Sequence, residues 1–335
     1  MMPHPREINE VHKPYFLITI DTEGDDLWSR PRTITTRNAE YLPRFQALCE
    51  VYGLKPTYLT NYEMANSPCF QEFGRGILQK NTGEIGMHLH AWDSPPLKPL
   101  TADDHKHHPY LMEYARDLMR EKIAVMTGLL EETFGAKMVS HRAGRWGMNE
   151  TYAQLLVEHG YRIDCSVTPN LSWRQHAGAP TGNGGADYSQ FPDEPYFVDL
   201  LDMGRPGDSP LLELPMTIFE KRVPLIFFLN RVFKNTSVIR ERLNYYRPTY
   251  FMFRPTGKNL NRLLNEVEAA VATKKRYIEF MLHSSEVMPG GSPNFPDEDS
   301  IEQLYHDLEI LFRVAAEKCT GATLKEYHDS YTASN

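Results

Sequence analysis

The sequence predicts a TIM-like α/β barrel, because short apolar strands alternate with amphipathic helices along most of the 335 residues. Repeated strand–helix units build a parallel sheet, and six or more such units favour a closed or nearly closed barrel over an open sheet. A chain of this length buries enough surface to fold without a disulfide or a structural metal. We therefore expect a single domain over residues 1–335.

The composition and the charge exclude several classes of protein. With 41% hydrophobic and 24% charged residues, the chain is neither disordered nor of low complexity. The 36 Lys and Arg residues against 44 Asp and Glu give a net charge of -8, whereas a dedicated nucleic-acid binder is usually basic. We expect no nucleic-acid partner, and nothing in the sequence defines an oligomeric state.

The cysteines and the apolar runs indicate in which cellular compartment the protein is expected. The four cysteines are widely separated and form no Cys-x-x-Cys pair, which predicts reduced thiols rather than a disulfide framework. No apolar run approaches the roughly 18 residues of a transmembrane helix, and the N-terminal residues lack the pattern of a secretory signal. We expect a cytoplasmic protein without a transmembrane segment.

The expected elements follow one another from residue 15 onward. Residues 15–20, YFLITI, form a short apolar and β-branched run, which is typical of a strand buried on both faces. In residues 38–52 apolar side chains recur every three or four positions and Gly53 follows, which predicts a helix and its end. The same signals predict further strands at 57–59, 84–90, 137–141, 161–167 and 277–283, and further helices at 70–78, 111–130, 152–159 and 300–318.

The alternation of strands and helices fails between residues 174 and 257. We interpret this stretch as an insertion after the fifth strand of the barrel, with a separate small domain as the alternative. Residues 219–247 within it hold seven Lys or Arg against two Glu, interleaved with aromatic residues. This basic segment is either a helical insert with a solvated face or a grip for a phosphate-bearing carrier.

Unusual polar residues stand at the ends of the predicted strands. In a parallel barrel the carboxyl ends of the strands converge on one face, where active sites lie. Residues that are distant in the sequence are therefore expected to meet there. The candidates are Asp21, Glu23, His88, His90, Arg142 and His283.

Asp21 and Glu23 follow the first strand directly. In extended chain, positions i and i+2 point to the same side, so both carboxylates can face one pocket. Two carboxyl groups at such a short distance need a cation or a shared proton between them. The alternative is a pair of solvated acids at the start of a loop or helix.

His88 and His90 are separated by one leucine in the segment GMHLH. This spacing places two imidazoles on one face of a strand, where both can reach one zinc ion, although a purely structural pair is the alternative. A rival group of Asp and His residues at 103–108 lies in a polar loop, and we interpret it as solvated.

Arg142 and His283 end two further strands. Arg142 can keep Asp21 ionised through a charge-assisted hydrogen bond, and Gly144 permits a tight turn close to a ligand. An imidazole at His283 suits proton donation near neutral pH. A surface arginine and a satisfied core histidine are the alternatives.

Four of these segments together resemble the polysaccharide deacetylase family, carbohydrate esterase family four. The segments ITIDTE, GMHLH, SHRAGRW and MLHSSE follow the order of the motifs of that family, and the resemblance covers residues 14–330. It implies a distorted (β/α)7 barrel that holds a divalent metal, most often zinc. It also implies Asp21 as general base, Glu23, His88 and His90 as metal ligands, Arg142 as the residue that orients the base, and His283 as general acid.

The sequence departs from the family motifs at two places. Trp92 stands where the second motif commonly has its second histidine, and Ala143, Gly144 and Arg145 replace prolines and an aromatic residue in the third. For the fourth motif, Asp164 and Trp173 are weak candidates. We expect substrate contacts from Trp92, Arg145, Trp146 and Trp173.

The resemblance predicts a metal-dependent enzyme that removes an acetyl group from an N-acetylated sugar, such as an intracellular precursor of a cell-surface polysaccharide. Two alternatives stay open. The protein can be a C–N hydrolase for a small linear or cyclic amide, or a catalytically silent barrel that binds glycans.

Overall fold

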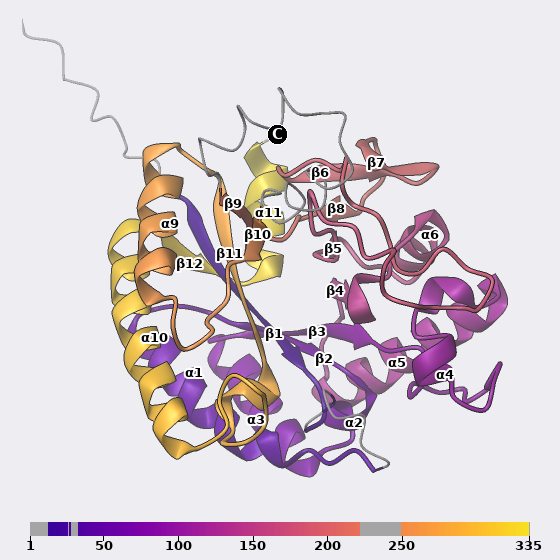
Figure 1. Cartoon of the computed structure of the whole chain (residues 1–335), viewed down its shortest axis with the longest axis horizontal. Helices are drawn as coiled ribbons and strands as arrows, with labels where there is room; N and C mark the ends of the chain where they lie inside the picture. Colours follow the sequence, from indigo (N-terminus) through magenta and orange to yellow (C-terminus); the bar gives the residue numbers. More distant parts are fainter. Residues whose placement is uncertain (1–12, 26, 28–32, 222–248, 335) are drawn as a thin grey trace, which may run out of the picture.

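A curled parallel sheet forms the centre of the computed structural model, which describes residues 13–25, 27, 33–221 and 249–334 (Figure 1). Its described strands run parallel in the order β11-β1-β2-β3-β4-β5-β8, and β12 (Thr320–Ala322) pairs with the start of β1. The strands are β1 (Tyr15–Thr22), β2 (Thr57–Thr60), β3 (Glu84–Leu89), β4 (Ser140–Ala143), β5 (Ile163–Asp164), β8 (Leu212–Glu213) and β11 (Tyr277–His283).

The barrel closes irregularly between β8 and β11. Among the described residues no ladder joins these two strands. Instead, the amide of Glu279 donates to Thr217 Oγ1 at 2.8 Å, and the amide of Met281 donates to the carbonyl of Phe253 at 3.1 Å. The result is a distorted seven-stranded barrel, which confirms the predicted fold class.

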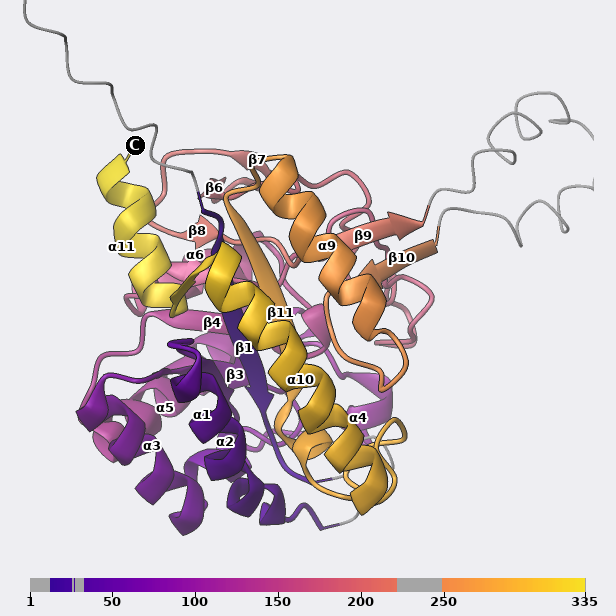
Figure 2. The same ribbon diagram turned by 90° about the vertical axis from the view of Figure 1, so that its left-hand side faces the viewer.

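Helices cover the outer face of the sheet. In Figure 2, α9 and α10 run side by side across β11 and β1. Neither α9 nor the C-terminal helix α11 was among the expected elements. The helices are α1 (Leu42–Val51), α2 (Tyr62–Ala65), α3 (Pro68–Lys80), α4 (Asp104–His107), α5 (Arg116–Phe134), α6 (Glu150–Glu158), α9 (Leu260–Ala272), α10 (Glu298–Lys318) and α11 (Leu324–Ser334), with short 3-10 turns at Arg37–Tyr41, Leu111–Glu113, Gly144–Trp146 and Ser284–Val287.

Residues 174–257 contribute to the barrel as well as to its periphery. β8 lies within this stretch and is a strand of the parallel sheet, while β6 (Tyr196–Asp199) and β7 (Asp202–Pro206) extend the sheet antiparallel. β9 (Ile218–Lys221) and β10 (Thr249–Met252) form a separate antiparallel pair. Residues 222–247 of the predicted basic segment lie outside the described residues.

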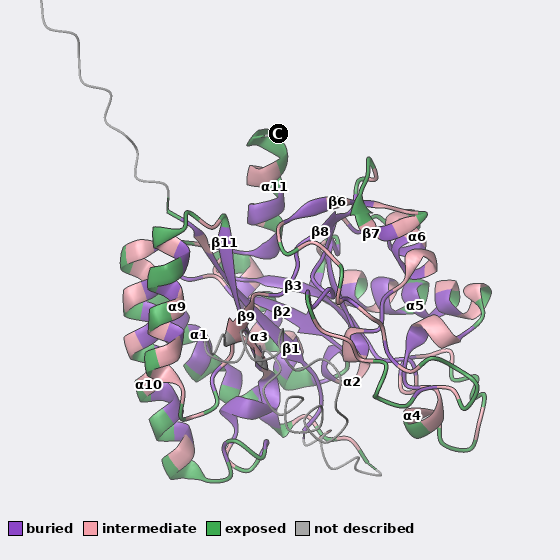
Figure 3. Cartoon of the chain, turned by 45° about the horizontal axis from the view of Figure 1, so that its top comes forward, coloured by how far each residue is buried: buried purple, intermediate pink, exposed green. Residues whose placement is uncertain are grey.

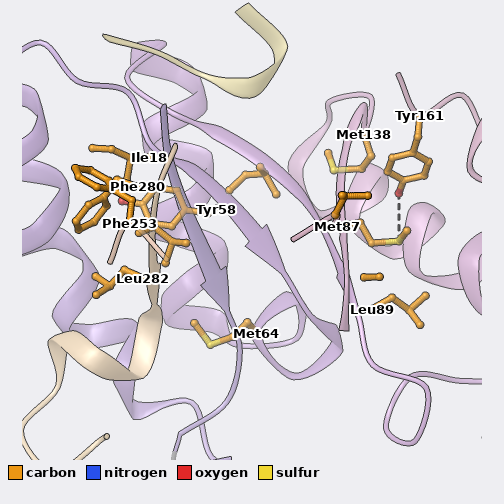
Figure 4. Packing of buried hydrophobic residues seen from close by; sticks show 14 of the residues in the cluster. Ile18, Tyr58, Met64, Met87, Leu89, Met138, Tyr161, Phe253, Phe280 and Leu282 are labelled. Atoms are coloured by element: carbon orange, nitrogen blue, oxygen red, sulfur yellow. Dashed lines mark hydrogen bonds between the residues drawn. The ribbon is translucent and has the colours of Figure 1, made fainter. Parts of the chain in front are cut away.

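Alternation along β1 separates an outer core from the barrel interior. The outward residues pack against the helices, and Figure 4 shows Ile18 beside Phe280 and Phe253 in this core. The inward residue Leu17 belongs to a second apolar cluster with Leu324 of α11. Because side chains two positions apart share a face, the inward line continues from Leu17 through Thr19 to Asp21.

The burial pattern agrees with this arrangement. In Figure 3 the strands β1 to β5, β8 and β11 are almost entirely buried, whereas the helices expose the side that faces away from the sheet. Among the described residues, no helix combines the length and the apolar character that a membrane crossing requires.

Candidate active site

The carboxyl ends of the strands surround a cavity of about 410 Å³. Nine of the ten predicted site residues line it, and Arg142 lies fully buried beside Asp21 at its floor. The structure thus brings together residues from four strands and the loops that follow them. The nine lining residues are Asp21, Glu23, His88, His90, Trp92, Arg145, Trp146, Trp173 and His283.

Glu23, His88 and His90 present three potential metal ligands to one point. The two imidazole Nε2 atoms lie 3.1 Å apart, and Glu23 Oε2 lies 2.9 Å from that of His90 and 3.5 Å from that of His88. Ligand atoms of a tetrahedral zinc ion, each at about 2.0–2.1 Å from the metal, are about 3.3 Å apart. The three side chains therefore fit a zinc-sized divalent cation with open coordination positions toward the cavity.

The ligand histidines are oriented by their surroundings. His88 Nδ1 donates to the carbonyl of Arg142 at 3.0 Å, which directs Nε2 toward His90 and Glu23. A Cβ atom on Gly144 would lie 2.5 Å from His90 Nδ1 and 2.7 Å from the carbonyl oxygen of Leu89. Only a glycine allows the chain after β4 to pass this close to the His90 ring.

The charge states of Glu23 and His90 suit a cation, whereas His88 would have to lose a proton before it could bind one. Burial alone would raise the pKa of Glu23, but hydrogen bonds from His88 and His90 hold it well below its usual range. Burial lowers the pKa of His90, so its imidazole is neutral. For His88, the carboxylates of Asp21 and Glu23 outweigh burial and raise the pKa.

Asp21 is held ionised by Arg142. The Arg142 Nη1 atom donates to Asp21 Oδ1 at 2.6 Å in a fully buried ion pair. Burial would raise the pKa of Asp21, but the guanidinium next to it and the nearby imidazoles lower it below its usual value. Asp21 Oδ2 remains on the cavity side, 3.8 Å from His283 Nε2.

A second carboxyl group shares the same guanidinium. Arg142 Nη2 donates to Glu279 and, at 2.8 Å, to Thr19 Oγ1, whose hydroxyl donates to Glu279 at 2.9 Å. Glu279 lies on the inward face of β11, two residues before Met281 and four before His283. Sequence analysis missed this residue, because nothing local distinguishes one acid within an apolar strand.

The shifted Glu279 carboxyl predicts a pH dependence of stability. Burial raises the pKa of Glu279 to about 7, although Arg142 next to it acts in the opposite direction. Since its ordinary value is 4.5, the folded protein binds more protons than the unfolded chain between these values. The free energy of unfolding should therefore fall as the pH rises through this window, by up to about 1.4 kcal/mol per pH unit.

Urea unfolding of the wild type and Glu279→Gln across this window measures the effect. The variant should show a shallower decline, whereas Glu72→Gln, which alters an exposed carboxylate on α3, should keep the wild-type slope. The same slope in Glu279→Gln and the wild type would contradict the prediction.

His283 is fixed by a carboxylate and an arginine that sequence analysis did not assign. Glu286 Oε2 accepts from the His283 amide at 3.0 Å and lies 3.3 Å from its Nδ1 atom. Arg254 donates to the same oxygen at 2.7 Å. Burial would raise the pKa of Glu286, but Arg254 and His283 lower it to about 2. Its position within MLHSSE, three residues after His283, was the available signal.

Aromatic rings form the upper wall of the cavity. Trp92 packs against His90 with ring centroids 4.3 Å apart. The His105 ring stacks on Trp92, also with centroids 4.3 Å apart. The interpretation of residues 103–108 as a solvated loop is therefore wrong for His105, which lines the cavity beside Tyr110. A polar sequence around a histidine does not reveal that a tryptophan covers it.

The two weak candidates for the fourth motif separate in space. Trp173 lines the cavity, and its indole N–H donates to Thr168 Oγ1 at 2.8 Å. Asp164 instead lies in the barrel wall, where it accepts from His141 Nδ1 at 2.6 Å. Asp164 is not a cavity residue, since its position on β5 turns it toward the helices.

Comparisons with known proteins identify the fold. No family model matches the chain, and no curated protein sequence matches it. A Mycobacterium smegmatis protein assigned as a polysaccharide deacetylase is 16% identical with a TM-score of 0.54, covering 99% of this chain and 95% of that one. A Parabacteroides distasonis protein assigned as a glycoside hydrolase/deacetylase is 10% identical with a TM-score of 0.61, covering 98% of this chain and 74% of that one.

A third solved structure shows that the fold is not restricted to one activity. A 4-alpha-glucanotransferase from Thermococcus litoralis is 14% identical with a TM-score of 0.52, covering 96% of this chain and 41% of that one. The chain has a polysaccharide deacetylase-like fold, as the four sequence motifs predicted. Because one fold hosts several activities, function has to be argued from the site.

Proposed function

We propose that the protein is a metal-dependent hydrolase that removes the acetyl group from an N-acetylated sugar. The observation that carries the proposal is the placement of three metal-ligand atoms, an ionised carboxylate and an imidazole around one cavity. Glu23, His88 and His90 would hold the metal, and Asp21 and His283 face the same space from β1 and β11. The likeness in fold to assigned deacetylases supports the same conclusion.

Each group has a defined role in amide hydrolysis. A divalent metal at the three ligands would supply Lewis acidity. Asp21 Oδ2 accepts the proton of the attacking water, since Arg142 occupies Oδ1 and keeps the carboxylate ionised. His283 Nε2, 3.8 Å from both Asp21 Oδ2 and Glu23 Oε1, donates a proton to the departing nitrogen. The products are acetate and a free amine.

Glu286 and Arg254 orient His283, the proposed proton donor. The Glu286 carboxylate accepts at the Nδ1 side of His283, which directs Nε2 toward the cavity. Arg254 neutralises Glu286. We assign both as positioning residues.

The cavity wall favours a sugar over a small amide. Three tryptophans offer flat apolar surfaces next to polar catalytic groups, an arrangement that fits a pyranose ring with one apolar face. A volume of about 410 Å³ exceeds what a small linear amide would fill. The C–N hydrolase for small amides remains the second candidate, because the catalytic groups alone do not distinguish the two.

Acetate release tests the proposal. The zinc-loaded protein should hydrolyse acetamido sugars, measured as acetate release, faster than it hydrolyses acetamide or opens the ring of a cyclic amide. Dialysis against a chelator should abolish the release of acetate. Added zinc should restore it, because the ligands are preorganised. Equal rates before and after chelation would contradict a metal-dependent reaction. Hydrolysis of the small amides alone would favour the second candidate.

A further inference from the structure

The charged groups that line the cavity are unevenly distributed. Its acidic side chains, Asp21 and Glu23, lie at the floor of the cavity. There Arg142 pairs with Asp21, and His88 and His90 contact Glu23. Above the floor the lining includes two arginines, Arg145 and Arg254, and no acid. This excess of positive charge is unexpected in a chain whose net charge is -8.

Arg145 is placed in the cavity by an unusual backbone. Arg145 and Trp146 have φ values of 54° and 60°, in the left-handed region that non-glycine residues rarely adopt. The Tyr188 hydroxyl donates to the carbonyl of Trp146 and accepts from the amide of Met148 at 3.2 Å. Such a conformation is strained and persists where the surroundings enforce it.

The Arg145 charge is not neutralised within the described part of the chain. There its guanidinium contacts the Tyr110 ring, at 5.6 Å from the ring centroid, and pairs with no carboxylate. The other two arginines of the site differ, since Arg142 pairs with Asp21 and Arg254 with Glu286. A guanidinium without a counter-charge, beside aromatic walls, attracts an anion more strongly than one in open water.

We propose that the substrate amide carries an anionic group, a carboxylate or a phosphate, which Arg145 binds. This inference rests on the proposed function and specifies its substrate class. Arg145 contributes through a charge-assisted and bidentate hydrogen bond, and the Tyr110 ring lies beside its guanidinium, with the ring centroid 5.6 Å away. It is a specificity residue, because it follows β4 whereas the acid–base groups lie on β1 and β11.

The test compares matched neutral and anionic probes. Acetate release is measured for N-acetylglucosamine, N-acetylglucosamine 1-phosphate, N-acetylglucosamine 6-phosphate and 2-acetamido-2-deoxyglucuronic acid, which separate phosphate from carboxylate. We expect kcat/KM of the zinc-loaded wild type to be at least about tenfold higher for one anionic probe than for the neutral sugar. Arg145→Gln should reduce this ratio to about one, and Arg145→Lys should retain part of it.

Two control measurements distinguish a failure of the anion-binding proposal from a failure of the proposed function. Arg205→Gln removes an equally charged but exposed arginine on β7 and should keep the wild-type ratio. Arg145→Gln should lower kcat/KM for the preferred anionic probe by at least about tenfold more than for the neutral sugar, because the anion contact is made with the anionic probe alone. Acetate release that does not prefer any anionic probe, or a preference that survives in Arg145→Gln, would overturn the inference while the proposed function stands. The absence of acetate from every probe would overturn both.

Discussion

A His88→Ala, His90→Ala double variant is expected to retain less than about a tenth of the metal bound by the wild type. The two Nε2 atoms, 3.1 Å apart, would supply two of the three proposed protein ligands, and Glu23 alone would leave a single carboxylate. Changes outside the ligand set already cost about 10–100-fold in metal affinity, so the loss of two ligands costs more. Elemental analysis after loading with zinc and dialysis measures the result, and acetate release should disappear with the metal.

His306→Ala is the matched control for this experiment. His306 lies exposed on α10, away from the cavity, so its removal should leave the metal content unchanged. Circular dichroism checks that the double variant folds, which it should, because the two histidines lie at the carboxyl end of β3 and outside the apolar clusters. Equal metal in the folded double variant and the wild type would remove the ligand assignment.

Asp21→Asn is expected to lower kcat by about 10²–10⁴-fold while the metal content stays at the wild-type level. The amide has nearly the same shape as the carboxylate and can accept the Arg142 hydrogen bond, but it cannot take a proton from water. The three ligand atoms are on other side chains, so metal binding is retained. Parallel measurements of acetate release and metal content separate a lost base from a lost metal.

The outcome of this variant also discriminates between the two neighbouring acids. If Asp21→Asn retained activity within about threefold of the wild type, Asp21 would not be the base. If it lost the metal, Asp21 rather than Glu23 would be the ligand carboxylate. Asp117→Asn, an exposed aspartate on α5, should match the wild type in both measurements.

Local patterns predicted most strands and helices that build the barrel. The expected strand at 277–283 has the observed bounds, and the expected helix at 300–318 begins two residues late relative to α10. Sequence analysis missed α9 and α11, and it placed β8 within an insertion. β8 comprises two residues, and its pairing with β5 comes from chain segments about fifty positions apart, so no local periodicity reveals it.

Local patterns could identify only some of the supporting residues of the site. Arg142 was expected to contact Asp21, and in the structure Arg142 Nη1 lies 2.6 Å from Asp21 Oδ1. Glu286 stands three residues after His283, within reach of a local pattern, whereas Arg254 acquires its role only because the chain after β10 brings it to Glu286.

The sequence by itself determined the class of fold and the residues that end its strands, because both depend on periodicity and on neighbours one to four positions away. Only the tertiary structure decided which of these residues share a cavity, which carboxyl group is held ionised and which arginine of the cavity has no counter-charge among the described residues. Those properties depend on burial and on charges contributed by distant segments, and a Coulomb interaction acts over distance in space regardless of separation along the chain.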